Sequence, residues 1–461
     1  MNTARKPICR IGAGAGFAGD RIDPAVALAA SGQVDTVVLE CLAERTLVPA
    51  LKARGDNPDA GFDPRLRRRL TPLLPAAAAT RCRIVSNLGA ANPRAAGLAI
   101  ARLAGELGCR GTRVAAVVGD DLLALREQIA WARPIAGKLL GAHAYLGSGA
   151  LADALDQGAD VVVTGRVADS ALFAAAAMHH LDADTDPPNS AAGQARGALP
   201  AASTATALAG AIAVGHLLEC GGQLSGGNYD PIGQGLLSAS DYARLGYPLA
   251  EVYADGSAEI RLLDGAPGIL NADTCTLQLF YEVHDPSRYA TPDLVLDFTG
   301  IRFEQVGHNR VRMSGARSLG PPPTLKVAGF LELPGFIADA EIGFAGTAAL
   351  ARAQRAAEAL RLRLSDWPDE DIAIDLVGVD SILRAGSLPS VGAPAELRVH
   401  VSARCADLEA AQVIEDEIYA LTLSGPAGGC SVRSERRSRI EVLDGFIAHE
   451  LVRPWIEWST S

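Results

Sequence analysis

The sequence predicts an α/β fold: a mostly parallel sheet with helices on both faces, followed by a smaller α+β domain. Up to residue 285 or so, short β-branched runs alternate with longer alanine-rich runs, which is the pattern of a parallel sheet and its crossover helices. From residue 286 the strand-like runs follow one another more closely. At 461 residues the chain exceeds one typical core, so two domains are expected, 1–285 and 286–461.

Five strands are expected in the first domain, because each is a short apolar run bounded by polar or glycine residues. They are Ile8–Ile11, Thr36–Leu39, Arg83–Val85, Arg113–Val118 and Asp160–Thr164. Helices are expected in the alanine- and leucine-rich runs, and two of them begin with the Asp-Pro or Asn-Pro pair that is typical of a helix start. The helical runs include Asp23–Ala30, Pro93–Leu107, Asp121–Ala132, Ala150–Gln157, Ala168–His179 and Thr204–Leu218.

The second domain is expected to begin after a turn-rich segment with two prolines. Its strands are expected at Leu294–Phe298, Val311–Met313, Leu325–Phe330, Glu341–Phe344, Ile372–Val379, Glu396–Val401 and Ser431–Val442. Two amphipathic helices are expected at Thr347–Leu364 and Asp407–Leu423. From about residue 325 the order strand-helix-strand-strand-helix-strand predicts a ferredoxin-like unit.

Nearly every predicted strand of the first domain ends in polar or glycine residues. In parallel sheets, ligands bind beyond the carboxyl ends of the strands. We therefore expect these chain segments to surround one shared ligand cleft. The segments are 12–21, 40–41, 86–87, 119–121 and 165–169.

Residues 216–230 hold the densest concentration of acid, base and nucleophile side chains. His216, Glu219 and Cys220 have the spacing of one helix face. They could serve general acid–base catalysis, a His–Cys thiolate pair or a metal; alternatively, His216 and Cys220 are ordinary core residues. The glycines that follow would let a ligand approach the backbone closely. The expected substrate-binding residues here are Gln223, Gly226, Gly227 and Asn228.

The motif Gly14-x-Gly16-x-x-Gly19 follows a strand and opens a helix, with Glu40 at the end of the next strand. This arrangement fits a dinucleotide-binding fingerprint. Asp20 and Asp23 oppose that interpretation, because they place negative charge where a pyrophosphate would meet the helix. A nucleotide site, a glycine turn that lines another ligand and a structural turn remain alternatives. Under the second alternative, the substrate-binding residues are Gly14, Gly16, Gly19 and Asp20.

Arg166 and Asp169 flank a strand-to-helix junction. The guanidinium could bind a carboxylate or phosphate through two parallel hydrogen bonds, or it could pair with Asp169. Asn87, at the end of the third strand, is expected to contact the substrate. Asp120, at the end of the fourth strand, is a further candidate base.

Composition excludes several classes of partner. The net charge of −11 argues against nucleic acid, and no apolar stretch reaches the length of a membrane span. The eight cysteines form no Cys-x-x-Cys pair, so neither a zinc knuckle nor a disulfide framework is expected. With no signal-peptide pattern, we expect a cytoplasmic protein that binds a small molecule and forms a homo-oligomer. No residue is assigned as a metal ligand, and the sequence leaves the cofactor open.

Six segments, in order along residues 8–445, together resemble the acyclic terpene utilisation family of the AtuA type. The resemblance implies a role in the breakdown of citronellol- and geraniol-type compounds through CoA thioesters, at a lyase or hydratase step. It gives no defined cofactor, although CoA would be part of the substrate. The segments are 10–21, 39–44, 163–169, 215–221, 225–228 and 425–429.

The leading hypothesis is a catabolic lyase or hydro-lyase that acts on a branched acyl substrate. Such chemistry needs a base for a proton and an electrophile for an enolate-like oxygen, and Arg166 or backbone amides of 12–19 or 221–227 would hold the anionic end. One alternative is a nicotinamide-dependent oxidoreductase that uses the glycine motif, and another is a non-catalytic ligand-binding or scaffold subunit. The candidate catalytic residues are Glu219, Glu40, Cys220, His216 and Asp120.

Overall fold

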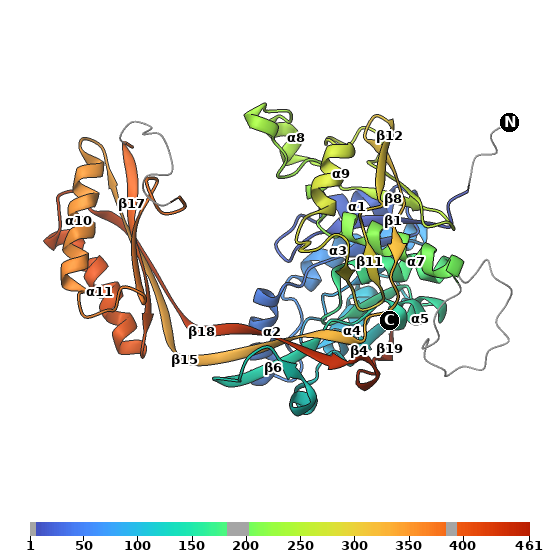
Figure 1. Cartoon of the computed structure of the whole chain (residues 1–461), viewed down its shortest axis with the longest axis horizontal. Helices are drawn as coiled ribbons and strands as arrows, with labels where there is room; N and C mark the ends of the chain where they lie inside the picture. The colour runs from blue at the N-terminus through green and yellow to red at the C-terminus, as the bar shows by residue number, and fades with distance from the viewer. Residues whose placement is uncertain (1–5, 182–201, 384–393) are drawn as a thin grey trace. The chain divides into compact units, whose positions relative to one another are not determined.

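The computed structural model describes residues 6–181, 202–383 and 394–461, and it has a mixed α/β fold (Figure 1). The chain forms two compact units. The first contains Met1–Arg133, Gly141–Gly329 and Leu443–Ser461, and the second contains Pro134–Leu140 and Phe330–Val442. Residues 286–329 and 443–461, which follow the sequence boundary at 285, therefore fold with the first unit.

The first unit is built on a ten-stranded sheet whose middle is parallel. The strand order is β12-β13-β9-β8-β1-β2-β3-β7-β4-β19. All five strands expected from the sequence lie in the parallel part, where the branched residues of neighbouring strands are fully buried. These strands are β1 (Cys9–Ala15), β2 (Thr36–Leu39), β3 (Arg83–Ser86), β7 (Val161–Thr164) and β4 (Arg113–Val118).

Antiparallel strands extend this sheet on both sides. β8 (Leu249–Val252) pairs with β1, and β19 (Trp455–Thr460) pairs with β4 from the far end of the chain. The expected strand at Val311–Met313 lies within β13 (Arg310–Ser314). β13 joins this sheet through β9 (Ala258–Arg261) and pairs with β12 (Arg302–Gly307).

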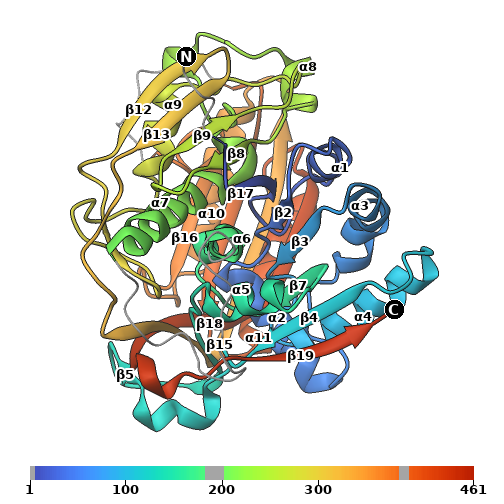
Figure 2. The ribbon, with the colours of Figure 1, turned by 90° about the vertical axis from the view of Figure 1, so that its right-hand side faces the viewer.

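Helices cover both faces of the parallel strands (Figure 2). On one face, α1 (Asp23–Ala30), α3 (Leu66–Thr80) and α4 (Pro93–Glu106) share a core with the sheet. On the other face lie α5 (Gly149–Asp156), α6 (Asp169–Leu181) and α7 (Ala202–Leu218). Among the described residues, no helix combines the length and the apolar character that a bilayer span requires.

The helices of this unit that were not expected from the sequence include α2 (Glu44–Asp56) and α3. α2 contains Pro49, and α3 contains Pro72 and Pro75. Proline disfavours a helix interior because it removes a backbone donor, so the local pattern concealed both helices. Burial of their leucines compensates, since Leu47, Leu70 and Leu73 are fully enclosed.

The prediction of a helix at Asp121–Ala132 is wrong. That segment forms the 3₁₀ helix η1 (Leu123–Gln128) and then the short strand β5 (Ala130–Trp131). β5 pairs with Gly445 and Phe446 of β18 (Cys430–Ala448). This long-range pairing overrides the local helical pattern, and β6 (Lys138–Ala144), also unexpected, follows it.

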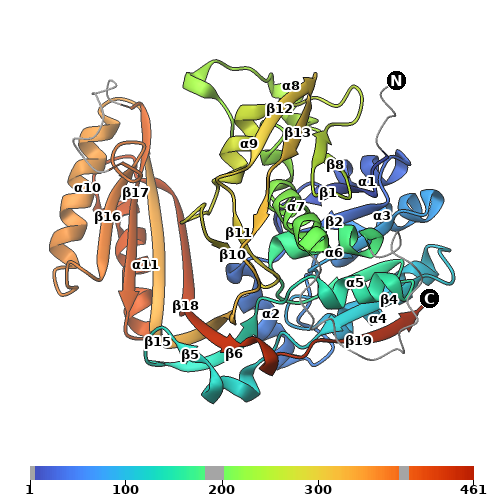
Figure 3. The ribbon, with the colours of Figure 1, turned by 45° about the vertical axis from the view of Figure 1, so that its right-hand side comes forward.

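Further short elements of the first unit follow α7 in the chain. η2 (Gly221–Gln223) follows α7, and α8 (Ala239–Ala243), α9 (Ala272–Leu279) and a small three-stranded sheet come later. Figure 3 shows this sheet beside α6 and α7. Its strands are β10 (Tyr289–Ala290), β11 (Val295–Asp297) and β14 (Arg317–Ser318).

The second unit packs two helices on one face of an antiparallel sheet in the order β16-β17-β15-β18. One continuous strand, β15, replaces the two runs expected at 325–330 and 341–344. Alternate residues of β15 and β17 form the core with both helices, as in Ile342 and Val399. The elements are β15 (Thr324–Ala345), α10 (Ala349–Arg363), β16 (Ile372–Val377), β17 (Glu396–Cys405), α11 (Leu408–Ser424) and β18 (Cys430–Ala448).

Gly14 offers a test of packing in the parallel core. A Cβ atom there would lie 2.6 Å from side-chain carbons of both Val37 and Leu39. We expect Gly14→Ala to lower the free energy of unfolding by about 1–3 kcal/mol, as overpacked core substitutions do. Urea denaturation measures the change.

Gly55→Ala is the matched control, because Gly55 lies in α2 with no atom within 4 Å of the added Cβ. Alanine is favoured over glycine in a helix by up to about 1 kcal/mol, so this variant should be as stable as the wild type or more so. Equal stabilities for the two variants would contradict the packing argument.

Candidate functional site

A cavity of about 720 Å³ lies in the first unit at the carboxyl ends of β1, β2 and β7. Gly16, Glu40 and Arg166 follow these three strands and line it. The end of α7 and the small β10–β11 sheet supply the other walls. Of the five strand ends expected to surround one space, three therefore line this cavity, while those at 86–87 and 119–121 do not.

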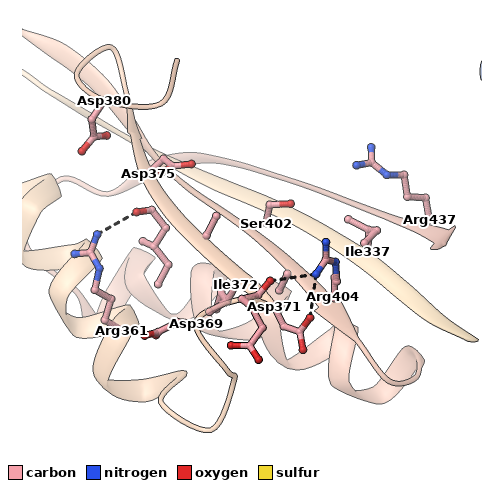
Figure 4. Close-up of a pocket in the computed structure, with 14 residues that line it drawn as sticks. Ile337, Arg361, Asp369, Asp371, Ile372, Asp375, Asp380, Ser402, Arg404 and Arg437 are labelled. Atoms are coloured by element: carbon pink, nitrogen blue, oxygen red, sulfur yellow. Dashed lines mark hydrogen bonds and ion pairs between the residues drawn. The ribbon is translucent and has the colours of Figure 1, made fainter. Parts of the chain in front are cut away.

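A second cavity, of about 730 Å³, lies in the second unit (Figure 4). Its charged side chains are largely engaged with protein groups: Arg404 contacts Asp371 at 3.3 Å, and Arg361 donates to the carbonyl of Ile374 at 3.0 Å. None of the residues predicted from the sequence as site residues lines it. We therefore place the candidate site in the first unit.

The predicted site residues divide into two groups. Those that line the first-unit cavity are Gly16, Glu40, Arg166, Asp169, His216, Glu219 and Cys220. Those that lie outside its lining are Gly14, Gly19, Asp20, Asn87, Asp120, Gln223, Gly226, Gly227 and Asn228.

Glu40 is a buried carboxyl at the end of β2. Its Oε1 accepts hydrogen bonds from the backbone N–H of Leu42 at 2.8 Å and from the amide of Asn87 at 3.0 Å. Burial, and secondarily the charge of Asp169, raise the pKa of Glu40 to about 8, although Arg166 and Asn87 act in the opposite direction. Glu40 therefore carries a proton near neutral pH, and Asn87 holds Glu40 in place from outside the cavity lining.

Glu219 and His216 form a buried acid–imidazole pair at the end of α7. His216 Nδ1 lies 2.9 Å from Glu219 Oε1, and Nε2 lies 3.1 Å from the carbonyl oxygen of Leu279. Because a carbonyl only accepts, Nε2 carries a hydrogen, and Nδ1 faces the carboxyl. Burial raises the pKa of Glu219 to about 7 despite the opposing effect of His216.

The imidazole of His216 is held on all sides. Burial lowers its pKa, but Glu219 outweighs this effect and raises the pKa above the usual value. The ring stacks on Phe298 with centroids 5.6 Å apart and lies 5.1 Å from the ring of Tyr289. Gln278 donates to the His216 carbonyl at 3.1 Å and accepts from Gln223 at 3.0 Å. Gln223 therefore supports this pair from behind.

Arg166 is fully buried, and its guanidinium is engaged with protein groups. Nε and Nη2 donate to the carbonyl of Val167, Nη1 donates to the carbonyl of Leu42 at 2.5 Å, and Nη2 pairs with Asp169. The guanidinium also lies 4.8 Å above the ring of Tyr145. Of the two alternatives weighed from the sequence, the structure shows the ion pair with Asp169.

Asp120 lies behind the cavity wall. Its Oδ2 accepts from the backbone N–H of Arg166 at 2.8 Å and contacts His143 Nδ1 at 2.8 Å. With an exposed fraction of 3%, this carboxyl anchors the β7–α6 junction. The geometry favours a supporting role over that of a base.

The backbone N–H groups of the glycine motif are occupied by a side chain of the same turn. Asp20 accepts hydrogen bonds from the N–H groups of Gly16 at 2.8 Å and Arg21 at 2.7 Å, and from the hydroxyl of Tyr247. The carboxylate thus takes amides that a pyrophosphate would need. A Cβ at Gly16 would lie 2.4 Å from the Cys220 backbone, and one at Gly19 would lie 2.9 Å from the ring of Phe17. The geometry favours a packed turn over a dinucleotide site.

The glycine-rich turn after α7 is also packed. A Cβ at Gly227 would lie 2.7 Å from the carbonyl oxygen of Gly222, while Gly226 and Asn228 adopt left-handed backbone angles. Within this region, only Cys220 and the end of α7 reach the cavity. Burial and the charge of Glu219 raise the pKa of the Cys220 thiol well above its usual value, so a thiolate nucleophile is disfavoured.

Several cavity residues were not among the site residues predicted from the sequence. The hydroxyl of Tyr145 donates a hydrogen bond to the carboxylate of Glu44, and the ammonium of Lys326 lies 5.2 Å from the Tyr145 ring. Burial raises the pKa of Glu44, but the Tyr145 hydrogen bond and nearby cations outweigh it, so Glu44 stays ionised. Arg45 and Arg288 also line the cavity. The only local signal was that Glu44 lies shortly after the polar strand end at 40–41, separated from it by Leu42 and Ala43.

Among the described residues, no group of three or more His, Cys, Asp or Glu side chains is placed to hold a metal ion. The fold and the cavity define an α/β protein with a candidate ligand site whose lining includes buried carboxyls. The sequence matches the family described as "Acyclic terpene utilisation family protein AtuA" over residues 9–199 and 201–458. The chain belongs to this family, which ties it to acyclic terpene utilisation. No curated protein and no solved structure gives a significant match.

The raised pKa of Glu40 predicts pH-dependent stability. A carboxyl with a raised pKa in the folded state stabilises most below its unfolded pKa, and this contribution is lost as the pH rises through the folded pKa, here about 8. Glu40→Gln keeps an oxygen acceptor for Leu42 and Asn87 but cannot ionise. We expect its stability relative to wild type to increase by more than about 1 kcal/mol between pH 6 and pH 9, since each pKa unit corresponds to about 1.4 kcal/mol.

Thermal or urea unfolding at the two pH values measures this difference. Asn87→Asp is not a suitable control, because it would add a second buried carboxyl. Glu358→Gln is suitable, since Glu358 is exposed on α10. A relative stability of Glu40→Gln that does not change with pH would show that Glu40 is already ionised at pH 6.

Proposed function

We propose that this protein is a catabolic lyase or hydro-lyase that acts on a branched, acyclic terpene-type acyl substrate carried as a CoA thioester. One observation carries the proposal: Glu40 and Glu219 line one cavity, both are buried, and each has a different hydrogen-bond partner. Two carboxyls with separately adjusted pKa values are suited to opposite proton-transfer roles near neutral pH. Membership of the terpene utilisation family supports the substrate class.

In the proposed hydration step, Glu219 accepts a proton from a water molecule whose oxygen forms a bond to the β-carbon of a conjugated acyl group. The electron pair of the C=C bond moves toward the α-carbon and the carbonyl oxygen. Glu40 then donates its proton to the α-carbon. One water molecule has now been added to the double bond, Glu219 is protonated and Glu40 is ionised. Elimination of water is the same sequence reversed.

His216 makes Glu219 a suitable base. Its Nδ1 faces the carboxyl, and its Nε2–H is fixed by the carbonyl of Leu279. The imidazole can therefore take up the proton that Glu219 receives without changing its orientation. The three aromatic and amide neighbours of His216 hold this geometry before the substrate arrives, which lowers the cost of reorganisation.

Lys326 is the proposed electrophile for the carbonyl oxygen. Its ammonium lies beside the Tyr145 ring and is also 3.2 Å from Asp444. A cation near the carbonyl oxygen would stabilise the negative charge that develops there in an enolate-like state. Arg166, by contrast, positions the loops around Asp169. Its guanidinium is engaged with protein groups, so we do not assign it to the carbonyl oxygen of the substrate.

We also propose a fold type and a role for the second unit. Its order β15-α10-β16-β17-α11-β18 and its sheet order β16-β17-β15-β18 support a ferredoxin-like arrangement. We propose that this unit serves assembly of a homo-oligomer in the cytoplasm, with a small molecule bound in the first unit.

The two carboxyls predict a bell-shaped pH profile for kcat/KM on a branched α,β-unsaturated acyl-CoA. Activity should rise with pH through about 7, as the Glu219–His216 pair releases its proton, and fall through about 8, as Glu40 loses its own. Glu219→Gln should lower kcat/KM by about 10²- to 10⁴-fold. Glu40→Gln should lower it similarly and remove the alkaline limb.

Steady-state assays across pH 5–10 test this profile. Glu358→Gln, at an exposed glutamate of the second unit, is the matched control and should leave the profile unchanged. Folded Glu219→Gln and Glu40→Gln variants with full activity, checked by circular dichroism, would remove both carboxyls from the mechanism.

A further inference from the structure

Two arginines that line the cavity have a different environment from Arg166. Arg45 lies in the first turn of α2, and Arg288 lies just before β10; both are exposed. Among the described residues, neither guanidinium makes a hydrogen bond or an ion pair with another side chain. We refer to Arg45 and Arg288 as the arginine pair. Its donors are available to a ligand.

The buried part of the cavity has the opposite character. Glu40 and Glu219 are carboxyls that lie there, and Asp169, whose side chain is 38% exposed, adds a third carboxyl to the lining. The cationic groups among the buried described lining residues are Arg166, already bound to Asp169, and the imidazole of His216. An anionic group placed there would lose its hydration, while both buried cationic groups are already engaged with Asp169 and Glu219, so burial would disfavour its charge. A ligand with an anionic end is therefore favoured only if that end stays near solvent.

Apolar groups provide a surface for a hydrocarbon chain in the same cavity. A cavity of about 720 Å³ is in the size range of sites that enclose a small molecule. Burial of a chain there would stabilise binding without polar partners. The apolar lining residues include Leu42, Pro292, Val295, Pro322, Pro323, Leu325 and Phe446.

We propose that the ligand of this cavity carries an anionic group, which the arginine pair binds near solvent, while its hydrocarbon part extends to the buried carboxyls. The inference rests on the proposed function, because it assigns an orientation to the substrate of that same site. Guanidinium groups bind carboxylates and phosphates through paired N–H donors. The anionic group is therefore the carboxylate of a free acid or a phosphate of CoA.

The test is equilibrium binding by isothermal titration calorimetry to the whole protein. Three probes separate the sources of charge: a branched ten-carbon carboxylic acid, its CoA thioester and the corresponding uncharged alcohol. The test variant is Arg45→Gln/Arg288→Gln. The control is Arg68→Gln/Arg102→Gln, which makes the same change in net charge at exposed positions on α3 and α4, outside the cavity.

We expect the test variant to weaken binding of at least one anionic probe by about tenfold or more, because a hydrogen bond to a charged group commonly contributes that much. The control variant should bind like the wild type, and the alcohol should bind both variants equally. A loss confined to the thioester identifies phosphate as the bound group. A loss that includes the free acid identifies the carboxylate.

The proposal is overturned if both anionic probes bind the test variant as tightly as the wild type. It is equally overturned if the control variant weakens binding to the same extent, or if neither anionic probe binds the wild type at millimolar concentration. The same titrations with Glu219→Gln separate this inference from the proposed function. Binding that depends on the arginine pair needs no turnover, so a failed lyase assay leaves it intact.

Discussion

The buried guanidinium of Arg166 is the interaction on which the geometry of the cavity depends. It joins the loop after β2, through the carbonyl of Leu42, to the β7–α6 junction, through Val167 and Asp169. Behind it, Asp120 fixes the backbone of the same residue. A buried charge persists only when it is paired and hydrogen-bonded, so these segments can adopt few other arrangements without exposing an uncompensated ion.

The raised pKa values of Glu40 and Glu219 follow from this framework. A single strong cation is already engaged with Asp169, so it lowers the pKa of Glu40 only in part, and burial dominates. His216 acts on Glu219 in the same partial way. Strongly shifted pKa values are common at functional sites. Here burial and the nearby carboxylate of Asp169 raise the pKa of both carboxyls, and Arg166 and His216 offset this effect only in part.

The glycine motif near the N-terminus shows how a spacing pattern and a packing requirement can coincide. Positions 14 and 16 require glycine, because other atoms occupy the space that a side chain would take. At Gly14 these atoms belong to core side chains, and at Gly16 they belong to the Cys220 backbone. Asp20 satisfies amides of the same turn. The spacing seen in dinucleotide-binding proteins is thus reproduced here by a turn that packs β1 against the segment following α7.

The sequence by itself determined the parallel strands, most of their helices and the polar character of the strand ends, because these features depend on local apolar patterns and on short-range turn chemistry. It also indicated Glu40 and Glu219 as cavity residues. Only the tertiary structure decided that Arg166 is bound internally, that Asp120 and Asn87 lie behind the cavity, and that the arginine pair lines it. These outcomes depend on contacts between residues far apart in the chain, and on whether a charged group finds its partner within the protein. No local pattern encodes either.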